Sequence, residues 1–130
     1  LSYVDEINRI TNNQGSDLVF DAVSGPGTHG LVKASKRGGR IIIQGMLDRR
    51  PMDIHAGVLM KRLLTLKGYT VDQTLNHPAQ KSRAITAIRN GFKHKDLNCV
   101  ISEQFKLSDY QKAFSTLSDN RHMGKIIITP

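Results

Sequence analysis

The sequence is short of cysteine, aromatic residues and long apolar runs, and each shortage narrows what the chain can be. A single cysteine, Cys99, excludes an internal disulfide and favours a reducing compartment, so we expect a cytoplasmic protein. Its apolar surroundings predict a buried thiol rather than a nucleophile. No apolar run approaches the roughly 20 residues that cross a bilayer, so we expect no membrane partner.

Acidic residues are also scarce, with 11 Asp and Glu against 19 Lys and Arg, which gives a formal net charge of +8. The basic residues are spread along the chain, and only Lys36–Arg37 and Lys93–Lys95 form local clusters. Aromatic residues make up 5% of the sequence and do not alternate with basic ones as base-stacking surfaces require. We therefore expect a solvated basic surface or a partly basic cofactor mouth, and no nucleic-acid partner.

The five histidines do not form a metal site by their spacing. None stands four residues from another, and with one cysteine the chain offers no tetrahedral zinc-ligand set. The sequence also contains no nucleophile-elbow motif of a hydrolase. We expect no metal ion here, and histidines that are solvated or cap helices.

Apolar runs alternate with helical patterns along the first part of the chain. The predicted strands are Asp17–Val23, Arg40–Gln44 and Leu64–Lys67. Near-continuous apolar runs of this kind are typical of strands covered on both faces, as in parallel sheets. Predicted helices over Thr28–Lys36, ended by Gly38 and Gly39, and over Ile54–Leu63 connect them. This alternation predicts parallel pairing with right-handed crossovers.

A predicted helix stands on each side of these strands, and the order of elements changes after Asn98. Apolar spacing predicts an amphipathic helix over the first ten residues, and a longer helix that begins at Pro78 and stops at Gly91. A strand over Val100–Phe105, a helix opened by a capping box of Ser108 and Gln111, and a last strand over Ile126–Thr129 follow.

These elements divide the chain into two parts. We expect a partial nucleotide-binding domain over residues 1–98. Residues 99–130 form a return segment of strand, helix and strand. This return segment is expected to pack toward a catalytic domain that lies outside the chain.

One glycine-rich segment has the spacing of a dinucleotide-binding loop. Gly25–Gly30 satisfies G-x-G-x-x-G after a predicted strand, and Asp48 follows at the distance of a ribose-binding acid. However, Pro26 lacks the N–H that a pyrophosphate needs, and the second strand ends at Gln44 without an acid. A phosphate loop and a turn with flexible backbone both stay open, and we favour the turn.

Four segments in order resemble the C-terminal half of the medium-chain dehydrogenase/reductase superfamily. They are Phe20–Gly25, Gly38–Gly45, Leu66–Tyr69 and Gly124–Ile128. The resemblance covers essentially the whole chain, and the branch most similar is that of the zinc-independent quinone oxidoreductases and NADPH-dependent enone reductases. In that family the glycine fingerprint lies well upstream of the first strand. The resemblance therefore implies that Gly25–Gly30 matches by coincidence and that the phosphate-binding half lies before Leu1.

The resemblance implies an α/β fold, the C-terminal half of a Rossmann-like parallel sheet followed by the return segment. The cofactor-binding residues it implies are Ala22, Val23, Ser24, Gln44, Gly45, Met46, Tyr69, Thr70 and Lys125. The first three would line the ribose and nicotinamide side, the next three would offer backbone groups, and Tyr69 and Thr70 would continue that wall. Lys125 could reach a phosphate. The implied cofactor is NADPH, with NADH as the alternative.

The family reaction is hydride transfer from the nicotinamide to a carbonyl, enone or quinone substrate. The groups that polarise the substrate would lie in the N-terminal domain, so we expect no catalytic residue here and an inactive chain in isolation. The alternative is a binding or dimerisation module without its own cofactor. A sheet that ends in unpaired edges invites association, so we expect a homo-oligomer. The family implies pairing across a two-fold axis through the strand near Leu63–Lys67.

Overall fold

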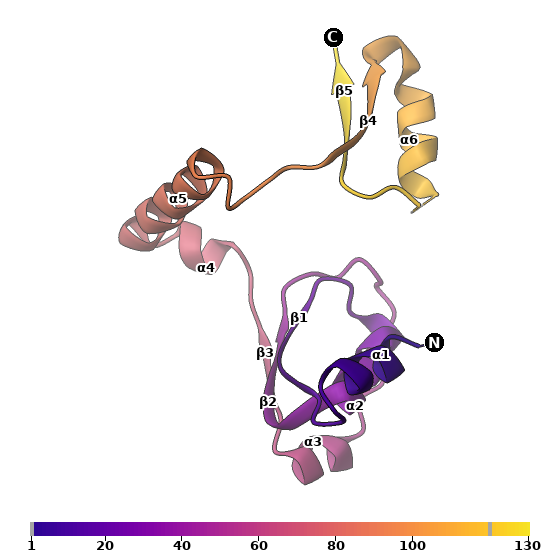
Figure 1. Ribbon diagram of the computed structural model, residues 1–130, viewed down its shortest axis with the longest axis vertical. Coiled ribbons are helices and arrows are strands. Elements are labelled where there is room, and N and C mark those ends of the chain that lie inside the picture. The colour runs from indigo at the N-terminus through magenta and orange to yellow at the C-terminus, as the bar shows by residue number, and fades with distance from the viewer. Residues whose placement is uncertain (1, 120) are drawn as a thin grey trace. The chain divides into compact units, whose positions relative to one another are not determined.

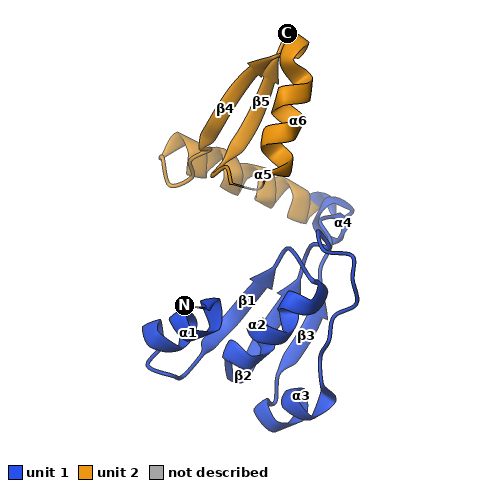
Figure 2. Ribbon diagram, turned by 90° about the vertical axis from the view of Figure 1, so that its right-hand side faces the viewer, with its two compact units in different colours: residues 1–78 blue, residues 79–130 orange. Residues whose placement is uncertain are grey.

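The computed structural model describes residues 2–119 and 121–130 (Figure 1). The chain divides into two compact units, Leu1–Pro78 and Ala79–Pro130 (Figure 2). This division falls earlier than the domain boundary predicted after Asn98, because the helix that begins at Pro78 groups with the second unit. The predicted functional boundary itself stays a prediction.

A three-stranded parallel sheet forms the centre of the first unit. Its strands β1 (Ser16–Asp21), β2 (Ser35–Ile43) and β3 (Thr65–Gly68) lie side by side in chain order. Helix α2 (Thr28–Ala34) connects the first two strands, and α3 (Ala56–Arg62) precedes the third. Each connection is therefore a strand–helix–strand crossover, and the predicted parallel α/β fold is confirmed.

The core of the first unit lies on the face of the sheet that α2 covers. Val19 and Ile41 are register partners on this face, and with Val32 of α2 they form the buried cluster. Ile41 is 0% exposed. On the opposite face of β1, Leu18 and Phe20 are 51% and 63% exposed. Only one face of this sheet is thus closed by the helices described.

The strand β2 begins earlier than predicted, and its two glycines lie inside it. Helix α2 ends at Ala34, and Ser35 already pairs with Ser16. The register then shifts so that Leu18 pairs with Arg40. Gly38 accommodates this irregularity with a φ of +77°, which is why a glycine is suited there. The prediction that Gly38 and Gly39 stop a helix was wrong.

The amphipathic helix expected at the start of the chain is confirmed as α1 (Tyr3–Ile10). Ser2 and Asp5 form its capping box. A short helix, α4 (Asp72–Leu75), was not predicted. Among the described residues no helix is long and apolar enough to cross a membrane.

The second unit contains two helices and a parallel strand pair. Helix α5 (Pro78–Lys93) continues past Gly91, so this glycine is not its stop. Strands β4 (Ile101–Lys106) and β5 (Lys125–Thr129) pair in parallel, and α6 (Tyr110–Ser118) packs against both. The predicted strand–helix–strand order is confirmed.

Two predictions in the second unit were wrong in detail. Ser108 lies in a 3₁₀ turn, η2 (Leu107–Asp109), and the residue before α6 makes no side-chain cap, so the predicted capping box with Gln111 does not form. Cys99 is exposed rather than buried, because it lies in the loop before β4.

Candidate functional site

The loops after β1 and β2 lie against each other at the carboxyl end of the sheet. The N–H of Gln44 donates to the carbonyl of Asp21 (2.9 Å), and the N–H of Asp48 donates to the carbonyl of Val23 (2.8 Å). Between these bonds, a Cβ on Gly45 would collide with the carbonyl oxygen of Ala22. Only glycine lets the two backbones approach this closely, so the loops form one continuous wall.

The end of β1 carries a buried carboxylate, that of Asp21, whose residue is 3% exposed. Its Oδ1 accepts the N–H groups of Val23 (2.9 Å) and Ser24 (2.8 Å), and its Oδ2 accepts the hydroxyl of Thr28 (2.7 Å). Burial raises the pKa of Asp21, but the bonds from Ser24, Thr28 and Val23 outweigh it, so the pKa lies below its ordinary value. Neutral donors therefore hold a buried anion in the turn.

The same donors bear on the role of Gly25–Gly30. The segment forms a 3₁₀ turn, η1 (Gly25–Gly27), that leads into α2. The N–H groups of Val23 and Ser24 already bind the Asp21 carboxylate, and Pro26 has none to offer. A second carboxylate, that of Asp48, packs against Gly25, since a Cβ built there would lie 2.6 Å from its Cγ. These observations favour the turn over the phosphate loop.

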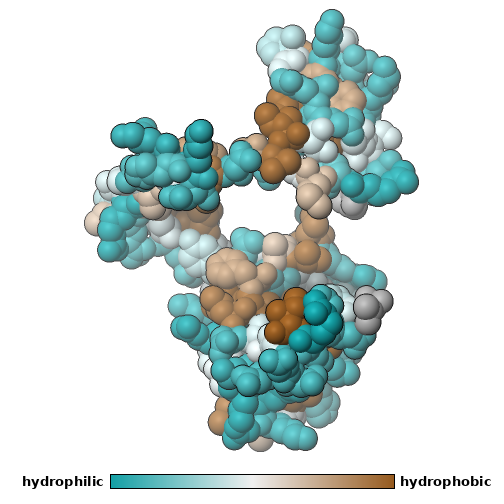
Figure 3. All heavy atoms as spheres, in the orientation of Figure 1, coloured by the Kyte–Doolittle hydropathy of each residue, from teal (hydrophilic) through white to brown (hydrophobic). Residues whose placement is uncertain are grey.

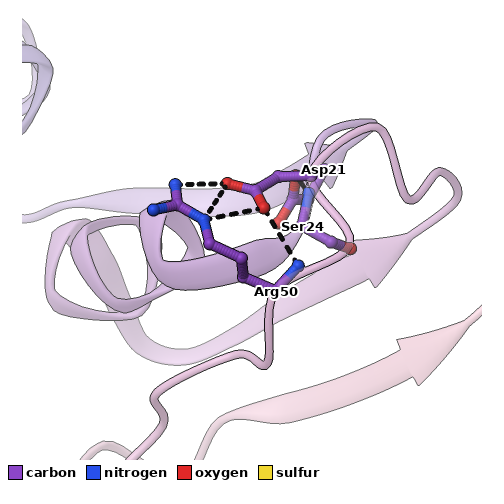
Figure 4. A network of polar contacts seen from close by, with 4 residues as sticks. Asp21, Ser24 and Arg50 are labelled. Carbon is purple, nitrogen blue, oxygen red and sulfur yellow. Dashed lines mark hydrogen bonds and ion pairs between the residues drawn. The ribbon is translucent and has the colours of Figure 1, made fainter.

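Ser24 and Arg50 extend this polar network over the loop that follows β2 (Figure 4). Ser24 is 6% exposed, and its Oγ donates to the carbonyl of Gly45 (2.8 Å). Its φ of +62° is rare for a serine and costs on the order of 1–3 kcal/mol. Arg50 contacts both carboxylate oxygens of Asp48, with Nη2 2.7 Å from Oδ2, and lowers the pKa of Asp48 to about 2. The network fixes both loops.

A pocket of about 480 Å³ lies beside this wall, at the carboxyl ends of β2 and β3. The N–H of Tyr69 donates to the carbonyl of Ile43 (2.8 Å), and its hydroxyl lies 2.8 Å from Thr74 Oγ1, which fixes the ring. Within the described residues, the N–H groups of Gly45 and Met46 donate to no other group. They are free donors for a polar ligand.

The structure groups eight of the nine predicted cofactor-binding residues around the carboxyl end of one sheet. The residues that line the pocket after β2 and β3 are Gln44, Gly45, Met46, Tyr69 and Thr70, with Ile43, Gly68 and Gln73. Ala22, Val23 and Ser24 line a second pocket of about 390 Å³ after β1, together with Tyr3 and Leu31. The roles predicted for these residues stay predictions.

Lys125 lies apart from this group in the chain, at the start of β5 in the second unit. There it lines a separate pocket of about 320 Å³ with Phe114 of α6. Sequence reasoning missed the role of Asp21 in the first unit. The signal that could have found it is an acid placed directly at the end of a buried strand, before a glycine turn.

A zinc site does not fit the residues described. Over residues 2–119 and 121–130, no three or more His, Cys, Asp or Glu side chains lie close enough together to hold a metal ion. The described part of this chain therefore contains no zinc-ligand set.

With this geometry in place, comparison with known proteins identifies the family. The family model described as zinc-binding dehydrogenase matches residues 2–128. The chain belongs to this family, within the medium-chain dehydrogenase/reductase superfamily, and corresponds to the C-terminal half that the sequence predicted. The family description names zinc, whereas the described residues offer no ligands for it.

Particular relatives resemble the chain at low identity. A phenolphthiocerol/phthiocerol polyketide synthase of Mycobacterium tuberculosis is 26% identical over 133 residues, which is 99% of this chain and 6% of that protein. A quinone oxidoreductase of Pseudomonas syringae matches 98% of this chain with a TM-score of 0.79 at 19% identity. A mycobacterial protein in complex with NADPH matches 98% with a TM-score of 0.81 at 12% identity.

The chain spans only part of the proteins it resembles. It covers 39% of each of these two solved chains. At these identities the structural matches establish the fold alone. What the relatives bind or reduce is a property of those proteins.

Proposed function

We propose that this chain supplies the nicotinamide side of the cofactor site of an NAD(P)H-dependent oxidoreductase. The reaction we infer is hydride transfer from the nicotinamide to a carbonyl, enone or quinone substrate. A bound nicotinamide supplies the hydride, and the protein supplies geometry. The observation that carries the proposal is that Gly45 and Met46, whose N–H groups donate to no described residue, line a pocket at the carboxyl ends of parallel strands. Open α/β sheets bind ligands at this end.

The residues of the pocket suit a flat amide-bearing ring. The free N–H groups of Gly45 and Met46 can donate to the carboxamide oxygen, and the Gln44 side chain can accept from its nitrogen. Tyr69 gives a rigid apolar wall because Thr74 holds its hydroxyl. Gly68 leaves room, since a Cβ there would meet nothing within 4 Å. This chain thereby binds and orients the ring.

The phosphate half of the cofactor fits the described residues poorly. Asp21 occupies the donors after β1, and Asp48 places a second negative charge beside Gly25. We therefore propose that other parts of the enzyme hold the pyrophosphate, and that this chain alone transfers no hydride. NADPH is the proposed cofactor, supported by the NADPH complex of one relative.

The alternative, a dimerisation module, is favoured by one observation. Strand β3 pairs only with β2 within the described residues, and all four of its residues are exposed. We propose that a second copy of the chain pairs along this edge, which keeps the predicted homo-oligomer. Light scattering after size exclusion tests it: Leu66→Lys should convert a dimer to a monomer, and an unaltered mass in the variant would contradict pairing there.

The cofactor proposal can be tested by dividing NADPH into its two halves. Backbone amide resonances are followed while the chain is titrated with reduced nicotinamide mononucleotide or with 2′,5′-ADP. The first should shift the signals of Gly45 and Met46, and the second should leave the signals of Val23 and Ser24 in place. Gln44→Leu should weaken the first response, while Gln14→Leu, a matched change in the loop after α1, should not.

The reverse result would overturn the proposal. If 2′,5′-ADP shifts Val23 and Ser24, then Gly25–Gly30 is a phosphate loop after all. If neither half shifts any signal at the carboxyl end of the sheet, the dimerisation module is the better description.

A further inference from the structure

A different pocket of the first unit lies among α1, α2 and α3. Its volume is about 600 Å³. The lining residues are Val4, Asn8, Lys33, His55, Gly57, Val58, Lys61 and Arg62. Pockets of 300–1,000 Å³ are typical of small-molecule sites. None of these residues belongs to the group around the strand ends.

The lining of this pocket is basic and contains no acidic residue. Lys33 comes from α2, and Lys61 and Arg62 from the last turn of α3. The Arg62 Nη1 donates to the carbonyl of Ser35 (2.5 Å), which fixes that side chain. A further guanidinium, that of Arg37, donates to the carbonyl of Lys61 (2.5 Å), so it lies next to the same corner.

The lysines of the pocket have no counter-charge of their own. In the described part of the chain, no carboxylate lies within 4.0 Å of the ammonium groups of Lys33 or Lys61. The acidic residues of the adjacent α1 have local partners: Glu6 pairs with Arg9, and Asp5 bonds Ser2. Both lysines are exposed to solvent and carry positive charge that no described carboxylate neutralises, so an anion in the pocket would be attracted by both.

We propose that this pocket binds a small phosphate-bearing ligand with at least two negative charges, such as a diphosphate. Lysine ammonium groups bind phosphate as point charges. Here Lys33 and Lys61 approach the pocket from two helices, and the amide of Asn8 and the imidazole of His55 add uncharged donors. The site is separate from the proposed cofactor site and does not depend on it.

The test uses inorganic pyrophosphate as the probe, with the full chain, followed by calorimetry at low salt. Lys33→Gln with Lys61→Gln should weaken pyrophosphate binding by about tenfold or more, since two charged contacts to the anion are lost. The matched control is Lys81→Gln with Lys93→Gln on α5, which removes the same charge elsewhere. It should bind as the parent chain does. Sodium chloride should weaken pyrophosphate binding by the control variant and by the parent chain alike.

Several outcomes would overturn the proposal. Equal weakening in both double variants would assign the effect to overall charge rather than to this pocket. Absence of pyrophosphate binding would also overturn it, and tight binding of a single-stranded oligonucleotide alone would identify a nucleic-acid surface instead. Reduced nicotinamide riboside, which carries no phosphate and so cannot compete for this pocket, serves as the second arm. Pyrophosphate that it displaces would be bound at the strand ends, not here. Unfolding midpoints of all variants show that each is folded.

Discussion

The two units of this chain use the same kinds of element but bury them to different depths. In the first unit Val32 and Ile41 are almost fully buried, at 2% and 0% exposure. In the second unit only Ala113 is buried among the described residues, although Ile126–Ile128 is as apolar as Ile41–Ile43. Apolar side chains reach the surface of the molecule in Figure 3. Apolar sequence alone therefore does not make a core.

The difference follows from the number of crossovers in each unit. The first unit has two strand–helix–strand connections, and their helices pack on one sheet face and on each other. The second has one such connection among the described residues, and its helix α6 packs against both strands of the pair. Phe114 and Leu117 of α6 are 59% and 46% exposed. We therefore expect the second unit to be less stable than the first when each is considered by itself.

The largest expected effect comes from the core of the first unit. Ile41→Ala should cost about 3 kcal/mol of unfolding free energy, because a fully buried side chain leaves a cavity. The matched change Ile128→Ala in the second unit, at 38% exposure, should cost about 1 kcal/mol or less. Hydrogen exchange of the β2 and β5 amides measures both. Equal losses would break the comparison between the units.

The buried polar turn of the first unit gives the next effect. Asp21→Asn should cost about 2 kcal/mol at pH 7, because an ionised acceptor of three hydrogen bonds is lost. The folded pKa of Asp21 lies below its unfolded value of about 3.9. Its stabilisation is therefore complete above about pH 4 and disappears as the pH falls through the folded pKa. Denaturation at a series of pH values from 7 downward should show that the stabilities of variant and parent approach each other below about pH 4.

The control for this carboxylate is Asp17→Asn on the same strand. Asp17 is paired with Lys36, but its side chain is 80% exposed. Exposed ion pairs contribute little to stability. We expect almost no change in the unfolding midpoint, and a loss as large as that of Asp21→Asn would contradict the importance of burial.

The close approach of the two loops predicts an effect of similar or smaller size. Gly45→Ala should cost about 2 kcal/mol, because its Cβ would collide with the Ala22 carbonyl and force the wall apart. Gly68→Ala, at the end of the neighbouring strand β3, meets nothing within 4 Å and should stay within about 0.5 kcal/mol of the parent. Thermal unfolding of the pair tests this, and two equal midpoints would show that the loops can move apart freely.

The smallest effect concerns the ion pair between the exposed Arg50 and the partly buried Asp48 in the loop after β2. Arg50→Gln should raise the pKa of Asp48 from about 2 toward its ordinary value, since the guanidinium and the backbone N–H of Arg50 hold it down. Carbon-detected titration of the carboxyl group measures the change. Arg49→Gln is the control and should leave the titration of Asp48 unchanged, because Arg49 makes no bond to it.

The sequence predicts the element types and the parallel pairing well, because buried parallel strands leave near-continuous apolar runs. The runs around Val19 and Ile41 are such cases, and both lie in the sheet. The wrong predictions of helix ends were made at glycines. Gly38 and Gly39 suit a helix end in sequence but serve a strand irregularity, and Gly91 lies within a helix that continues to Lys93. Tertiary pairing decides between these uses.

The candidate site could be predicted in part. Residues at the ends of strands, such as Gln44 and Tyr69, meet at one edge of a parallel sheet whatever the loops do, so their proximity follows from topology. The capture of the Val23 and Ser24 donors by Asp21 could not be predicted, because it depends on one rotamer and on the left-handed backbone of Ser24. The acid at the strand end is visible in the sequence, but the rotamer and the backbone conformation that complete the capture are not.

The carboxylate of Asp21 behaves as a resident substitute for the anion that a glycine-rich loop would otherwise recruit. A scan for nucleotide-binding loops by glycine spacing alone would accept this chain. Asp21 stands at the end of the strand, four positions before Gly25. An acid at this position distinguishes a loop whose N–H groups bind a carboxylate of the same chain from one that leaves them free for a phosphate. Sequence searches for phosphate-binding loops could include the residue type at this position, and an acid introduced there could abolish phosphate binding by a designed loop.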